Sequence, residues 1–309
     1  MNSADLYAQI ATRGAVAELP RAKFRLTGAD RLRYLNGQVS NDVRKLTPAA
    51  AMQACVMTAK GKMSADIFIS AAADWLLVDA EPSLRETLAA RFEKYIISDD
   101  VTLEDVTDDL TLVHIIGTLP PAFSAGDTPA RTSRRYGRPG LDILVKSDEV
   151  SAAIAQLSQH LVPIDDAMLE TLRIEAGIPR WGFELGEDTI PVEAGLDRTA
   201  IDYHKGCYIG QEVISRLKSI GHVNRHLHGF ISTSGAPLEP GMRLFTPADP
   251  AREIGRLTSA AYSFALEKPV ALGYLKRGTV ADTLEARPAN ETGGGTACPV
   301  TVKELPIIP

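Results

Sequence analysis

The chain is organised around residues 202–212, which read DYHKGCYIGQE. Within this stretch Cys207 lies between Lys205 and the flexible Gly210. Beyond Gly206 the apolar residues recur at helical spacing, so the pattern predicts a helix whose N-terminus is at Cys207. A helix N-terminus and the ammonium of Lys205 both favour an anion, and we therefore expect them to depress the pKa of the Cys207 thiol.

A plainer interpretation of Cys207 stays open, because a lone cysteine is commonly a small buried apolar residue. Lys205 and the two glycines favour a reactive thiol instead. Positions 206 and 210 carry no side chain, so another backbone or a flat ligand could approach the sulfur closely. Cys207 and Lys205 are therefore the candidate catalytic residues.

The segment 205–212, KGCYIGQE, resembles the signature of the YgfZ family, which are folate-binding proteins related to the aminomethyltransferase (T-protein) of the glycine cleavage system. Other segments fit the same family in order, namely 35–43, 60–62, 172–179 and 191–196. The resemblance implies an α+β, T-protein-like multi-domain fold. Its expected parts are a folate-binding core, a ferredoxin-like antiparallel sheet unit and a C-terminal β-barrel.

The composition is that of an ordinary globular protein with ample core, since the 309 residues are 45% hydrophobic and 23% charged. A net charge of -6 argues against a broad nucleic-acid surface. Cys55, Cys207 and Cys298 are widely spaced, which fits a reducing compartment better than a disulfide framework. Residues 1–13 lack the pattern of a secretion or import signal, and no segment has transmembrane length, so we expect a cytoplasmic protein with no membrane contact.

The elements expected in the first two thirds of the chain follow from alternation, helical spacing and turn residues. We expect helices at 3–13, 30–37, 82–96, 147–161 and 165–177, and strands at 15–19, 23–26, 52–58, 65–70, 75–79, 101–106, 110–116 and 141–145. Residues 117–130 read as a surface loop. The strands from 52 onward are expected to form one antiparallel sheet covered by helices.

From residue 225 the pattern changes to short alternating runs separated by turns, which predicts a small β-barrel. Its expected strands are 226–232, 242–247, 253–261, 270–275 and 300–305, with a loop at 281–296. The expected domains are a folate-binding core made of 1–48 and 163–224, a ferredoxin-like domain at 49–162, and a barrel domain at 225–309.

Glu193 is the first candidate for holding a ligand. Beside Gly195 its carboxylate could accept two parallel hydrogen bonds from a ring N–H and an amino group, as a pterin presents them. The resemblance implies that Glu193 holds the pterin, although a solvated loop acid is the commoner role of such a residue. The amides of Asn36 and Gln38 could orient a polar ring, but turn chemistry is an equally common role for this cluster.

On the resemblance, five more residues are candidates for folate binding: Asp66, Tyr208, Gln211, Arg216 and Trp181. No intrinsic metal site is expected, because the histidines at 222, 226 and 228 have no acid nearby to complete a ligand set. The serines at 40, 64 and 215 lack the context of a hydrolase nucleophile.

The first functional hypothesis is a protein that binds tetrahydrofolate, or a one-carbon derivative of it, and assists assembly or repair of iron–sulfur clusters. The resemblance implies iron–sulfur assembly proteins and client iron–sulfur enzymes as partners, with an indirect effect on tRNA modification and no direct nucleic-acid contact. A soft thiolate suits iron, so Cys207 is the expected contact with a cluster, a partner or a sulfur species.

The alternative is a folate-dependent aminomethyltransferase of the glycine cleavage type. Two differences from T-proteins speak against it. Asp66 follows Ala65 where T-proteins carry paired acids, and Cys207 stands where they have an aspartate. A scaffold with a vestigial folate pocket is a third possibility that the residues leave open.

Overall fold

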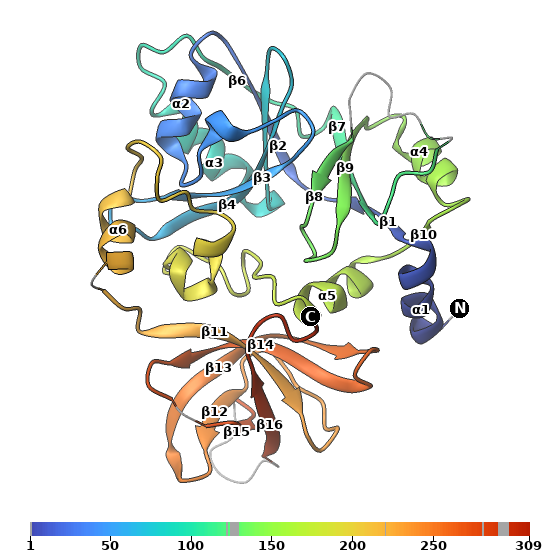
Figure 1. Cartoon of the computed structure of the whole chain (residues 1–309), viewed down its shortest axis with the longest axis vertical. Helices are drawn as coiled ribbons and strands as arrows, with labels where there is room; N and C mark the ends of the chain where they lie inside the picture. The colour runs from blue at the N-terminus through green and yellow to red at the C-terminus, as the bar shows by residue number, and fades with distance from the viewer. Residues whose placement is uncertain (1, 122, 124–129, 220, 280, 290–296) are drawn as a thin grey trace.

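The computed structural model describes residues 2–121, 123, 130–219, 221–279, 281–289 and 297–309. This part of the chain forms two five-stranded sheets and one closed β-barrel. Figure 1 shows the two sheets next to each other above the barrel, with helix α5 (Asp166–Glu175) between the second sheet and the barrel.

The first sheet has the strand order β3-β4-β5-β2-β6, and all of its pairs are antiparallel. Its strands are β2 (Ala22–Thr27), β3 (Met52–Met57), β4 (Met63–Ala71), β5 (Leu76–Ala80) and β6 (Thr102–Asp105). Burial alternates along most of β4, as the two-residue period of a strand requires. Helices α2 (Arg31–Gln38) and α3 (Arg85–Glu93) contribute Leu35 and Phe92 to the core on one face.

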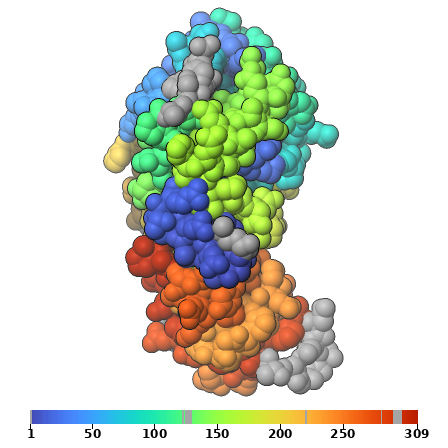
Figure 2. All heavy atoms as spheres, turned by 90° about the vertical axis from the view of Figure 1, so that its right-hand side faces the viewer, coloured from blue at the N-terminus to red at the C-terminus, as the bar shows by residue number. Residues whose placement is uncertain are grey.

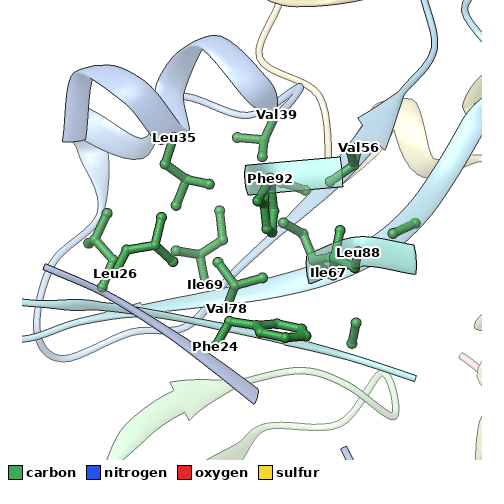
Figure 3. Close-up of a cluster of buried hydrophobic side chains, with 14 of the residues drawn as sticks. Phe24, Leu26, Leu35, Val39, Val56, Ile67, Ile69, Val78, Leu88 and Phe92 are labelled. Carbon is green, nitrogen blue, oxygen red and sulfur yellow. The ribbon is translucent and has the colours of Figure 1, made fainter. Parts of the chain in front are cut away.

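Figure 3 shows this core, in which Phe24, Ile67 and Val78 from the strands point toward the side chains of the two helices. All of these side chains are fully buried. Burying an apolar side chain of this size contributes about 1.5–3 kcal/mol. The hydroxyl of Tyr34 donates a hydrogen bond of 2.5 Å to the Phe92 carbonyl, which ties α2 to the end of α3.

The second sheet has the order β10-β1-β7-β9-β8, and its one parallel pair joins β1 to β10. Its strands are β1 (Ala15–Leu19), β7 (Leu110–Ile116), β8 (Arg131–Ser133), β9 (Gly140–Lys146) and β10 (Val162–Pro163). Helix α4 (Val150–Leu157) packs on one face through Leu157. Figure 2 shows α1 (Ser3–Arg13) in blue between this sheet and the barrel, where the rings of Tyr7 and Phe264 are 5.6 Å apart.

A buried ion-pair network joins the two sheets. Arg135 donates to Asp79 of β5 at 2.6 Å and to Asp142 of β9 at 2.8 Å. Because both carboxylates are buried, leaving either of them unpaired would be costly. Burial, the largest influence, raises the pKa of Asp142, but the contacts with Arg135 and His114 together outweigh it and lower this pKa to about 2.

The barrel closes in the order β11-β14-β13-β12-β15-β16. Its strands are β11 (Arg225–Ser232), β12 (Arg243–Thr246), β13 (Asp249–Ser263), β14 (Lys268–Lys276), β15 (Thr283–Arg287) and β16 (Cys298–Lys303). The buried carboxylate of Glu184 fastens the barrel to the segment before it. It accepts hydrogen bonds from Thr258 at 2.6 Å and Ser259 at 2.5 Å, and from Arg173 of α5 at 2.8 Å.

The segment that connects the parts contains short elements. These are the 3-10 turns η3 (Pro191–Ala194) and η4 (Leu196–Arg198) and the helix α6 (Gln211–Ser219). Two further 3-10 turns, η1 (Val43–Lys45) and η2 (Pro82–Leu84), precede β3 and α3. No described helix is long and apolar enough to cross a membrane.

The predicted α+β, T-protein-like fold with a C-terminal barrel is confirmed, but three local expectations are wrong. The strands expected in one sheet are divided between two. β8 was not foreseen, and β15 occupies part of the loop expected at 281–296. Residues 122, 124–129 and 290–296 of the two expected loops lie outside the described residues.

Candidate functional site

A cavity of about 850 Å³ lies where the two sheets, the connecting segment and the C-terminal tail meet. Its apolar lining includes Leu46, Met52, Phe68, Ile178, Leu196 and Leu305. The second sheet contributes Thr132 and Ser133 of β8 and Gly140 of β9. Gln53 of β3 and Arg135 contribute polar groups to the same wall. An apolar cavity with a few placed polar groups is the usual form of a small-molecule site.

A smaller cavity of about 90 Å³ adjoins it and shares Gln53, Phe68 and Arg135 with it. Asp66 and Trp181, two of the sequence-predicted residues, line this smaller cavity. The guanidinium carbon of Arg135 lies 3.9 Å from the centre of the Phe68 ring, so these two side chains form a stacked boundary between the cavities.

Asp66 is a titratable group of this region whose pKa is shifted close to neutral pH. It lies on β4 opposite Cys55, and its carboxylate accepts a hydrogen bond of 2.9 Å from the Gln53 amide. Burial is the largest influence and raises the pKa of Asp66 to about 7, while Arg21, Gln53 and Arg135 act in the opposite direction. A carboxyl with such a pKa beside a cavity can hold or release a proton at neutral pH.

The loop that carries Cys207 is anchored by Lys205. The ammonium of this buried lysine donates to the carbonyl oxygens of Asn36, Val39 and Asn41 at 2.7, 2.6 and 2.7 Å. These bonds use the three donors of the Lys205 ammonium. Burial lowers the pKa of Lys205 to about 8.

The Cys207 side chain is exposed, whereas those of Cys55 and Cys298 are buried. The expected position of Cys207 at a helix N-terminus is wrong, because α6 begins at Gln211. The turn before the helix depends on Gly210, which has a φ of 90° and whose missing Cβ would lie 2.7 Å from the Thr58 carbonyl oxygen. The chain must therefore turn at this glycine before the helix can start.

The Cys207 loop is attached to the rim of the large cavity. Asp202, at the start of the loop, forms an ion pair of 2.5 Å with Lys45, and Lys45 lines the cavity. The Asn41 amide donates to the carbonyls of Gln53 at 2.9 Å and Thr199 at 3.2 Å, and both of these residues also line it. The thiol loop and the cavity are thus two parts of one connected region.

Several candidates have structural partners instead of facing the cavity. The Asn36 amide oxygen accepts from the Val43 N–H at 2.9 Å, and that of Gln38 accepts from Arg91 at 2.9 Å. Tyr208 is buried, and burial raises the pKa of its hydroxyl. Gln211 and Arg216 belong to α6 and are absent from the described lining of both cavities.

The Glu193 carboxylate has partners within the protein. It accepts a hydrogen bond of 2.9 Å from Arg225 and caps the N-terminus of η3 through the Ile190 N–H at 3.5 Å. Its neighbours Ala194 and Gly195 line the large cavity, but Glu193 is not among the described lining residues. The sequence could not indicate this, because Arg225 lies in the barrel strand β11.

Sequence reasoning missed Gln53, Phe68 and Arg135, which form the boundary between the cavities. Gln53 had one usable signal, since a polar residue in an apolar strand is unusual. In the part of the chain that the structure describes, no group of three or more His, Cys, Asp or Glu residues is arranged to hold a metal ion.

The fold is similar to that of a solved T-protein. The solved structure of glycine cleavage system aminomethyltransferase T from Bartonella henselae matches with a TM-score of 0.82 over 98% of this chain and 89% of that chain, at 16% identity. The family model for the glycine cleavage T-protein C-terminal barrel domain matches residues 225–307, which include the whole described barrel up to β16.

Curated relatives extend the likeness beyond the barrel. A putative chloroplastic transferase of Arabidopsis thaliana is 26% identical over 82% of this chain and 63% of its own length, so the chain spans less than two thirds of it. The tRNA-modifying protein YgfZ of Klebsiella pneumoniae is 28% identical over 70% of this chain and 71% of its own. The mitochondrial iron–sulfur cluster assembly factor IBA57 homolog of Mycosarcoma maydis is 27% identical over 69% of this chain and 56% of its own length.

The chain is thus similar, at 26–28% identity, to proteins named as YgfZ, as an IBA57 homolog and as an aminomethyltransferase.

Proposed function

We propose that this protein binds tetrahydrofolate, or a one-carbon derivative of it, in the cavity of about 850 Å³. The cavity volume falls in the range that encloses a drug-sized ligand, roughly 300–1,000 Å³. The observation that carries the proposal is the combination of this apolar cavity with Asp66 and Gln53 at its junction with the smaller one. The similarity to T-proteins supports the choice of a folate.

In this proposal the pterin ring lies toward Phe68, with its polar edge toward Asp66 and Gln53. An ionised carboxylate accepts hydrogen bonds from ring N–H and amino groups, and the Gln53 amide offers both a donor and an acceptor. In this proposal Asp66, and not Glu193, is the carboxylate that binds the pterin.

We further propose that the folate-bound protein assists assembly or repair of iron–sulfur clusters in client enzymes, with Cys207 as the contact. Support comes from the exposure of this thiol on a loop joined to the cavity rim, and from the YgfZ and IBA57 relatives. The cluster or its sulfur would be cargo, and a soft thiolate is a suitable ligand for it. We propose a cytoplasmic location and no direct nucleic-acid contact.

A second candidate function is aminomethyl transfer to tetrahydrofolate. The observation that favours it is the raised pKa of Asp66, about 7, which suits proton exchange with a ligand amine. Adding the purified protein to a glycine cleavage system that lacks its T-protein separates the two functions. Restored glycine cleavage would establish the transferase.

Folate binding is tested by titration with tetrahydrofolate, following calorimetry and the fluorescence of Trp181 in the smaller cavity. Ala50 lines the large cavity, so Ala50→Trp should fill it and abolish binding. Ala59→Trp, in the exposed turn before β4, is the matched control and should bind as wild type does. Absence of binding to the wild-type protein would overturn the proposal.

The iron–sulfur part is tested in cells that lack the gene. Cys207→Ser keeps a similar volume but removes the soft ligand, so it should bind tetrahydrofolate normally and fail to restore iron–sulfur enzymes. If the serine variant restores those enzymes as fully as wild type, Cys207 has no such role.

A further inference from the structure

The C-terminal tail, residues 304–309, leaves the barrel and forms part of the wall of the large cavity. Strand β16 ends at Lys303, and the tail beyond it reaches the end of α5, beside which Figure 1 shows the C-terminus. Leu305 and Pro306 of the tail line the cavity. The barrel therefore contributes to the cavity through a segment that is not itself a strand.

The tail is fixed by apolar side chains that pack against two glycines. A Cβ at Gly177, just beyond α5, would lie 2.8 Å from Cδ2 of Leu305. A Cβ at Gly229 of β11 would lie 2.4 Å from Cγ1 of Ile307. Ile307 is 7% exposed and belongs to the core cluster that joins the barrel to the connecting segment. Both side chains thus occupy space that any larger residue at the two glycine positions would fill.

Polar contacts contribute little to the attachment of the tail. Its far end is held by a hydrogen bond of 3.0 Å from the Ile308 N–H to the Glu175 carbonyl. Pro306 and Pro309 have no N–H to donate. No ion pair or side-chain hydrogen bond joins the tail to the rest of the chain that the structure describes. Lifting the tail would therefore leave no buried charge without a partner.

Other walls of the cavity are joined to their neighbours by polar contacts between separate parts of the fold. The Ala51 N–H donates to the Thr132 carbonyl of β8 at 2.9 Å. The Thr199 hydroxyl donates to the Gln53 side-chain oxygen of β3 at 2.8 Å. Moving either wall would break these bonds, whereas moving the tail separates mainly apolar surfaces. A segment held in this way opens more readily than one held by hydrogen bonds between strands.

We propose that the C-terminal tail is a lid of the large cavity, which lifts Leu305 from Gly177 to admit a ligand and then closes over it. Lys303 pairs with Gly229 in the barrel, so the movement is confined to the residues that follow it. The inference rests on the proposed function for its ligand, tetrahydrofolate, and adds the entry route and the control of ligand release. In the closed state Leu305 and Pro306 exclude water from this side of the ligand.

The first test measures rate constants by stopped-flow mixing with tetrahydrofolate, followed by Trp181 fluorescence. Leu305→Ala weakens the closed state and keeps Ile307 in the core, so we expect kon to rise about threefold and koff about tenfold. Loss of a contact with a fixed wall would raise koff and leave kon unchanged. Leu266→Ala, at an exposed barrel leucine outside the described lining, is the matched control and should keep both rate constants.

The second test is hydrogen exchange in the wild-type protein, which detects opening of the tail without any ligand. The Ile308 amide should have a protection factor at least about tenfold lower than the amide of Phe230, which lies fully buried in strand β11. Exchange at Ile308 needs only the tail to open, whereas exchange at Phe230 needs the barrel to open. Saturating tetrahydrofolate should slow exchange at Ile308, because the ligand holds the closed tail in place.

Two results would overturn the lid: an unchanged kon in Leu305→Ala, or equal protection of Ile308 and Phe230. If tetrahydrofolate does not bind to the wild-type protein, the proposed function is wrong, and exchange at Ile308 alone decides whether the tail opens. Melting temperatures of the two leucine variants close to that of wild type establish that the proteins compared are folded.

Discussion

Lys205 and Cys207 are two positions apart in the chain and have opposite environments: the lysine is 6% exposed and bonded to three carbonyls, whereas the cysteine is exposed. The lysine fixes the backbone of the loop, and this presents the thiol at the surface. The motif therefore contains two residues with different roles: Lys205 holds the loop in place, and Cys207 exposes its thiol to solvent.

The exposure of Cys207 predicts the number of thiols that react in the native protein. With a thiol reagent such as DTNB, one thiol per chain should react quickly, and all of them after denaturation. Cys55 is fully buried, and burial raises the pKa of its thiol further from neutrality. Cys207→Ser should abolish the fast phase, and a fast phase that survives this substitution would contradict the assignment.

Lys205→Met should destabilise the protein by about 3 kcal/mol, because three carbonyl oxygens would lose a charged donor. Urea denaturation followed by circular dichroism gives the free energy of unfolding. Lys60→Met, at an exposed lysine in the neighbouring turn, is the control. An equal loss in the two variants would show that the anchor is unimportant.

Asp66 predicts a specific dependence of stability on pH. Its carboxyl has a pKa raised by burial to about 7, against an ordinary value of 3.8, so the folded state binds its proton more tightly than the unfolded state does. The stabilising contribution of this group is complete below pH 3.8 and is lost as the pH rises through 7. Denaturant titrations from pH 4 to 8 should therefore show a flatter profile for Asp66→Asn than for wild type. The exposed Asp74→Asn should leave the wild-type profile unchanged.

The same titration should affect ligand binding. If the pterin edge donates to an ionised Asp66, tetrahydrofolate affinity should rise as the pH increases from 6 toward 8, and Asp66→Asn should remove this rise. Calorimetry at several pH values measures both. A rise of the same size in the asparagine variant would assign it to another group.

Glu193→Gln should act on stability and not on folate affinity. It removes the ion pair with Arg225, which is partly exposed, and we expect a loss of about 1 kcal/mol. Affinity for tetrahydrofolate should stay near that of wild type. A large loss of affinity with unchanged stability would restore the ligand-holding role first suggested for this residue.

The sequence was sufficient to predict the helices and strands whose pattern is local. The apolar alternation of β4 and the helical spacing of α2 and α5 were read close to their observed bounds. The sequence was insufficient to predict which strands pair when the partners are distant in the chain. β2 follows β1 directly, yet it pairs with β5 while β1 pairs with β7, and no local signal separates these choices.

The candidate site shows the same limit. Cys207 could be singled out from its neighbours in sequence, and its exposure agrees with a contact role. The fate of the Glu193 carboxylate depended on Arg225, 32 residues later. Arg134 and Arg198 belong to no recognisable motif, because they line the same cavity from two distant parts of the chain.

The walls of the large cavity come from both sheets, the connecting segment and the tail that holds Leu305, so no single part can form it. A molecule bound in this cavity contacts all of these parts of the fold. It dissociates when any one of them unfolds. Binding energy is then shared among units that could otherwise melt in separate steps. In a calorimetric scan, a saturating ligand should merge those steps into one sharper transition, because it stabilises the two sheets, the connecting segment and the tail together.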